Sequence, residues 1–173
     1  MVAARFLKLK QILFASVSMI ILFFSGSNAF AAPTLSVQGQ ITNPDGSTYT
    51  ATGVQFIIRV YSPGPEQCIL YSETQTKDVS STGGFSLLLN DGTGTRTDGN
   101  ANTFVEAFSN QKPFTIAGTN CLVGSGTVTY TPTEYDERKL LIYFKDSTMS
   151  GYESMPMTTI AHSASALDAL RLG

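Results

Sequence analysis

The sequence predicts an all-β protein: an antiparallel β-sandwich of about seven strands, with a cleaved signal peptide before it and a short helical, stalk-like segment after it. Three observations support this. A leader-like run occupies 1–32, apolar and polar residues alternate with a period of two in short segments across 33–157, and the spacing changes to three and four over 158–173. Helical segments do not alternate with the strands, which argues against a parallel sheet.

Residues 1–32 have the three parts of a secretory signal peptide. Three basic residues and no acid stand in the first ten positions, an apolar run follows, and small residues allow cleavage after Ala31 or Ala32. A membrane anchor is the alternative, but the run is short for a membrane span. We therefore expect export to the periplasm, the outer surface or the extracellular space, without membrane insertion after cleavage.

The charge of the exported part restricts its partners. The leader contains three of the 11 basic residues and none of the 13 acids, so the remainder carries a net charge of −5. Nucleic acids and anionic membranes are held mainly by basic patches, and neither is expected here. The roughly 140 residues that remain suit one domain with its own core.

The strands are predicted from alternation between turn signals such as the Pro-Asp-Gly turn at 44–46. The most regular one has Val54, Phe56, Ile58 and Val60 in a single apolar row. The candidates lie at 34–42, 52–62, 68–79, 84–90, 126–132, 138–146 and 152–160. Pro156 restricts the last one to a sheet edge or a strand end.

A short helix is predicted over 103–110. Thr103 is its expected N-cap, and Phe104, Val105 and Phe108 are expected to turn inward. The stretch 112–126 that follows reads as irregular.

Two cysteines, Cys68 and Cys121, remain in the exported part. An oxidising compartment and an even count favour a structural disulfide between them. A zinc site needs about four ligands, and the single histidine, His162, lies far along the chain. We predict a disulfide, no metal and no cofactor.

A glycine-rich loop over 91–102 is the candidate ligand-facing segment. Asp91, Arg96, Asp98 and Asn100 are its polar residues. Oxygen ligands on such a loop could take calcium, but the spacing matches no EF-hand. We expect either an exposed hairpin or a loop that faces a ligand.

The sequence does not indicate an enzyme. A serine-histidine-aspartate triad needs a histidine, and His162 lies in the helix-forming tail. The charged residues of 134–139 sit in an apparent turn with compensating charges, so we expect a solvated surface there rather than an acid–base pair.

The final segment, 158–173, changes to helical spacing. Ile160, Ala164, Leu167 and Leu170 form one apolar stripe, and these are the candidate oligomerisation residues. The stripe covers about three turns, which is too short for a stable isolated helix. It is either the start of a coiled-coil stalk, a terminal helix that folds back on the sandwich, or a disordered tail.

Several segments together resemble a known family. They are the strand pair at 36–63, the hairpin at 68–97, the helix at 103–110, the strand segment at 130–146 and the exit "ESMPMTTIAHSASALDAL". These resemble the N-terminal β-sandwich module of secreted, phage-tail-fibre-like trimeric surface proteins of predatory (Bdellovibrio-like) bacteria. The resemblance implies a Cys68–Cys121 disulfide and a trimeric shaft after the exit. No shaft follows Gly173, so we expect a fragment or a short paralogue.

The expected function is therefore that of a non-enzymatic, secreted adhesion module, the head or base of a homotrimeric surface fibre used in cell attachment or prey recognition. Its partners would be other copies of itself and a glycan or protein on another cell. One alternative is a stand-alone module that binds carbohydrate or peptidoglycan, for which exposed tyrosines are the candidate contacts. The other is a pilin-like subunit completed by a donated strand.

Overall fold

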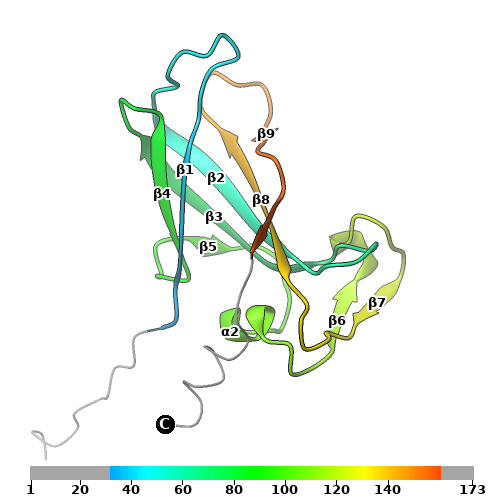
Figure 1. Cartoon of the computed structure of the whole chain (residues 1–173). Helices are drawn as coiled ribbons and strands as arrows, with labels where there is room; N and C mark the ends of the chain where they lie inside the picture. The colour runs from blue at the N-terminus through cyan, green and yellow to red at the C-terminus, as the bar shows by residue number, and fades with distance from the viewer. Residues whose placement is uncertain (1–31, 161–173) are drawn as a thin grey trace, which may run out of the picture. The chain divides into compact units, whose positions relative to one another are not determined.

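The computed structural model describes residues 32–160. Strands dominate this range (Figure 1). Its elements are β1 (Leu35–Gln40), β2 (Ala51–Tyr61), β3 (Ile69–Val79), β4 (Gly84–Leu89), β5 (Thr95–Arg96), α2 (Phe104–Phe108), β6 (Phe114–Ala117), the 3₁₀ helix η1 (Gly118–Asn120), β7 (Thr127–Tyr130), β8 (Arg138–Lys145), β9 (Glu153–Ser154) and β10 (Thr158–Ile160). The predicted signal peptide, apart from Ala32, and residues 161–173 of the predicted stalk lie outside the described residues.

The strands form one large sheet and two small ones, and every pairing is antiparallel. The large sheet has the order β10-β8-β2-β3-β5, with β9 pairing the far end of β8. The small sheets are β1-β4 and β6-β7. The prediction of an all-β, antiparallel protein is therefore confirmed.

Strand β2 forms the centre of the core. Its predicted apolar row, Val54 to Val60, is fully buried. The strand pairs with β3 along one edge and with β8 along the other. The apolar rows of β4 and β8 are buried as well, as the alternation predicts: Phe85, Leu87, Leu89, Leu140, Ile142 and Phe144.

The β1-β4 pair lies against one face of the large sheet (Figure 1). Phe85 of β4 packs on Phe56 of β2, with ring centroids 5.1 Å apart. Gly39 of β1 leaves room for the Phe85 ring, because a Cβ at this position would lie 2.5 Å from Phe85 Cζ. Two facing sheet layers are consistent with a β-sandwich, although the second layer contains only two strands.

The last predicted strand divides at Pro156 into β9 and β10. Between them, the Met155 N–H donates to the Ile142 carbonyl at 2.8 Å, and Ile160 then pairs with Arg138 of β8. The sheet therefore reaches Ile160 rather than ending at 157, and Ile160 is extended rather than helical. Pairing with the free edge of β8 outweighs the local helical spacing. The part that Ile160 plays in oligomerisation stays a prediction.

Two other segments differ from expectation. The stretch 112–126 contains β6 and η1, and the loop 91–102 contains β5. Both strands are short. Strand β5 pairs with β3, which is distant in sequence, and β6 pairs with β7 after a long connection. Local alternation gives little signal over two to four residues.

Helix α2 begins where its cap predicts. Thr103 and Glu106 form a capping box, in which each side chain accepts the other residue's N–H. Phe104 and Phe108 are buried as expected, but Val105 is 38 % exposed and Ala107 is buried. The prediction for Val105 was wrong because residues three and four apart share a helix face, whereas adjacent residues do not.

Arg138 was expected on a solvated turn, and this expectation was wrong: its side chain is completely buried. Its Nε donates to the Ala107 carbonyl at 2.7 Å, and its Nη2 donates to the Ser109 carbonyl at 2.9 Å and to Asn110 Oδ1 at 2.7 Å. Its Nη1 donates to the Tyr130 hydroxyl at 3.0 Å. Burial lowers the pKa of the guanidinium, although arginine remains charged in proteins. The side chain thus holds the end of α2 and strand β7 to β8.

Replacing Arg138 with methionine should strongly destabilise the domain. Methionine fills much of the space but leaves several buried acceptors without a donor, at about 1–3 kcal/mol each. We expect the free energy of unfolding in a denaturant titration to fall by about 3 kcal/mol or more. Lys139→Met, one position along β8, should change it by less than about 0.5 kcal/mol. Equal effects of the two substitutions would contradict the role given to Arg138.

Candidate functional site

Cys68 and Cys121 form the predicted disulfide. Cys68 directly precedes β3, and Cys121 directly follows η1. The Leu122 N–H also donates to the Gln67 carbonyl at 3.2 Å, so the segment after η1 is fixed against the β2–β3 connection. The bond joins positions 53 apart in sequence, and closing a loop of that size typically stabilises a fold by about 2–4 kcal/mol.

The predicted ligand-facing loop is largely anchored to β3. Asp98 is buried and accepts the Ser72 N–H at 2.9 Å, the Arg96 Nε–H at 2.8 Å and the Asn100 N–H at 2.7 Å. The Asn100 amide donates to the Ile69 carbonyl at 2.9 Å. The polar groups of these three loop residues therefore already have partners within the fold.

Asp91, the fourth predicted loop residue, lies apart from these contacts. Its carboxylate accepts the hydroxyl and the N–H of Thr93, and these hydrogen bonds lower its pKa. The structure does not bring Asp91 together with the other three in a common site. A ligand-facing role for the loop stays a prediction.

The loop also covers Glu73, an acid that is 2 % exposed. Its carboxylate accepts hydrogen bonds from the Tyr71 hydroxyl, from Gln75 Nε2 at 2.7 Å and from the Asn90 N–H at 2.9 Å. A Cβ at Gly94 would lie 2.0 Å from Glu73 Oε1, so the glycine is required for this close approach. Three donors stabilise the buried carboxylate, and its role is structural.

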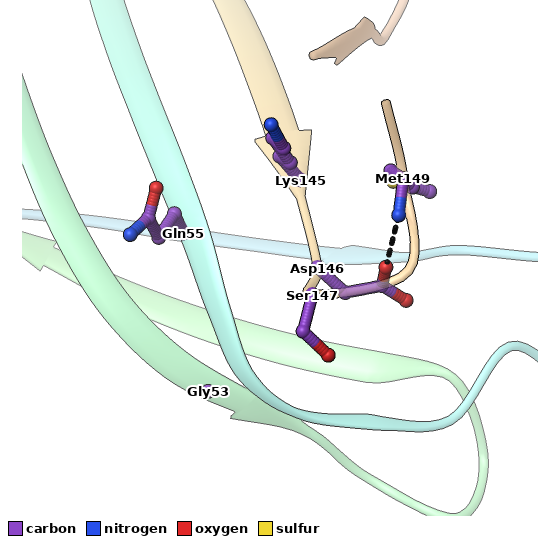
Figure 2. A pocket seen from close by; sticks show the side chains of 6 residues that line it. All are labelled: Gly53, Gln55, Lys145, Asp146, Ser147 and Met149. Atoms are coloured by element: carbon purple, nitrogen blue, oxygen red, sulfur yellow. Dashed lines mark hydrogen bonds between the residues drawn. The ribbon is translucent and has the colours of Figure 1, made fainter. Parts of the chain in front are cut away.

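The candidate site is a cavity of about 360 Å³ where β2 begins and β8 ends (Figure 2). It is lined by Gly53, Gln55, Lys145, Asp146, Ser147 and Met149. Gln55 and Lys145 are paired in register on neighbouring strands. A shift in the β2–β3 register occurs between Ala51 and Val54, and Gly53 takes a φ of +64° within it. A bulge bends its strand and increases the local twist, so β2 departs from regular pairing beside the cavity.

Asp146 organises one wall of the cavity (Figure 2). One carboxylate oxygen accepts the Tyr49 hydroxyl at 2.6 Å, and the other accepts the Thr148 hydroxyl at 2.7 Å, the Thr148 N–H at 2.8 Å and the Met149 N–H at 3.0 Å. These bonds, that of Tyr49 foremost, lower the pKa of Asp146 to about 2. The carboxylate is ionised and its acceptor positions are largely occupied.

The remaining polar groups of the cavity are mostly donors. The Lys145 ammonium lies 6.0 Å from the Tyr152 ring centroid and donates to the Ser150 carbonyl at 3.5 Å. The ion pairs of the described residues, Arg96–Asp98 and Lys112–Glu106, do not include it. Gln55 Oε1 accepts the Tyr152 hydroxyl at 2.9 Å, which leaves its Nε2 hydrogens as donors.

The sequence contains one signal for this site, the glycine within β2. A glycine inside a strand, such as Gly53, often marks a bulge or a close approach. Lys145 and Gln55 alone are ordinary strand residues, and their neighbourhood depends on the β2–β8 register.

Comparison with protein-family models, with curated proteins and with solved structures finds no match for the chain. The family resemblance therefore stays a prediction. In residues 32–160 no three His, Cys, Asp or Glu side chains gather as a metal site would require. Among these residues, no helix combines the length and the apolar character that a membrane span requires.

The wall built on Asp146 can be tested by titration. Because its folded-state pKa lies below the usual 3.8, its contribution to stability is complete above about pH 4 and is lost as the pH falls towards 2. We expect the side-chain carboxyl carbon, followed by NMR, to titrate near pH 2. In Tyr49→Phe it should titrate closer to its usual value, and an unchanged midpoint in this variant would contradict the assigned cause.

Proposed function

We propose that the chain is a secreted, non-enzymatic structural and adhesion module, the head or base of a homotrimeric surface fibre. The domain itself would not carry out chemistry. It would present a rigid surface at the end of a stalk formed by 161–173 of three copies. The partners are other copies of the chain and a glycan or protein on another cell.

The observation that supports this best is the position of β10. Its last residue, Ile160, is half-buried and packs against the core while its backbone pairs with β8. The apolar stripe of Ala164, Leu167 and Leu170 continues from this residue. A stalk that begins at a paired strand is joined to the head without a flexible linker, as a fibre requires.

Trimerisation would supply the stability that the stripe lacks. A stripe of about three turns does not hold a helix by itself, but three copies can bury it together. Three heads on one stalk would also raise a weak affinity through effective concentration. The disulfide suits a head exposed outside the cell.

The pilin-like alternative has less support. Pilin-type subunits need a partner's strand to cover an open core. Here the inner row of β8 is already buried, with exposures of 6–9 % at Leu140, Ile142 and Phe144. A stand-alone binding module remains the second candidate, and the cavity beside Lys145 is the observation that favours it.

The proposal predicts that the mature chain is a trimer whose assembly depends on the tail. Light scattering on a sizing column should give the mass of a trimer for the chain that begins at Ala32. The same chain without residues 161–173 should give the mass of a monomer. The deletion starts at 161 because residues 158–160 belong to the sheet.

Substitutions within the tail provide a matched control. Replacing Leu167 and Leu170 with serine should give monomers, whereas Asp168→Asn with Arg171→Gln, off the stripe, should leave the trimer intact. A chain that is monomeric with its tail would overturn the fibre proposal and favour the stand-alone binding module.

A further inference from the structure

We infer that the cavity beside Lys145 is a binding site for an acidic saccharide, a sugar ring that carries a carboxylate. The inference deepens the proposed adhesive role and rests on it for the choice of a saccharide. It does not depend on trimerisation, because all six lining residues belong to one chain.

The polar groups of the cavity call for a ligand that accepts hydrogen bonds. Lys145 is a half-buried cation without an ion-pair partner among the described residues. Gln55 Nε2 donates, since its oxygen already accepts from Tyr152, and Asp146 already accepts four hydrogen bonds from Tyr49, Thr148 and Met149. A carboxylate at Lys145 would form a charge-assisted hydrogen bond.

A sugar ring suits the rest of the cavity better than a small anion. The volume of about 360 Å³ falls within the ~300–1,000 Å³ of small-ligand sites. The Ser147 hydroxyl both donates and accepts, so it can satisfy a sugar hydroxyl. The Met149 side chain and the 43 % exposed Tyr152 ring beside Lys145 offer apolar surface for the carbon face of a ring.

Two carboxylates oppose an anion at this site. The ionised Asp146 lines the cavity itself, and Asp78 of β3 accepts the Gly53 N–H at 2.8 Å near the same strand end. The domain as a whole is also acidic. We therefore expect a weak single site whose affinity becomes useful when several heads bind together.

The test is an NMR titration of the mature chain with a glucuronate-containing disaccharide. We expect shifts in the amides of Gly53, Lys145 and Ser147 that saturate with ligand. The neutral glucose analogue, acetate and a short alanine peptide with a free carboxyl terminus should each bind at least ~10-fold more weakly. Equal binding of any of these three would overturn the assignment to an acidic saccharide.

Matched variants locate the site. Lys145→Gln should weaken binding by ~10-fold or more, whereas Lys139→Gln on the same strand should not change it. Asp78→Asn keeps the acceptor for Gly53 and should leave binding equal or tighter. Shifts that persist in Lys145→Gln, or no shifts in the unaltered chain, would overturn the inference.

A further variant separates the site from the fold. Gly53→Asn keeps the left-handed backbone that asparagine tolerates and places a side chain at the cavity, so it should reduce binding without loss of folding. Binding retained by the tail-deleted monomer would show that the site stands even if the trimer does not form. If the mature chain forms a trimer but no form of it binds the saccharide, the binding inference is wrong and the fibre proposal is unaffected.

Discussion

The double pairing of β2 is the constraint on which the rest of the domain depends. Its backbone is paired with β3 on one edge and with β8 on the other, and its inner row from Val54 to Val60 has no exposed surface. A strand in this position cannot shift by one residue without turning its whole apolar row outward. The register of β2 therefore sets the positions of both neighbours and of every side chain along them.

The cavity and the buried Arg138 lie at opposite ends of the β2–β8 pair. At one end, β2 begins with a bulge at Gly53, and β8 finishes with Lys145, directly before Asp146; these residues line the cavity. At the other end β8 starts with the buried Arg138, which fastens α2 and β7 to the sheet. The β2–β8 pair therefore has the candidate ligand site at one end and the attachment of α2 and β7 to the sheet at the other.

Alternation and turn residues were enough to predict the β class, the buried rows and the capped start of α2. They failed where distant partners decide the outcome. From sequence, Arg138 is predicted to lie on the surface, but α2 and β7 supply acceptors that hold its side chain inside the fold. Asp98 is predicted to face a ligand, but its carboxylate accepts hydrogen bonds from Ser72 and Arg96. The cavity depends on a bulge and on the β2–β8 register, neither of which local periodicity defines.

The central claim is that the folded domain extends to Ile160, from which the proposed stalk would continue. Hydrogen exchange of the mature chain, followed by mass spectrometry, tests this most directly. If the claim holds, peptides covering 155–160 will be protected as long as those of β8, because the two segments form one paired unit. Exchange of 155–160 within seconds, while β8 stays protected, would show that the head ends earlier and that a flexible linker precedes the stripe.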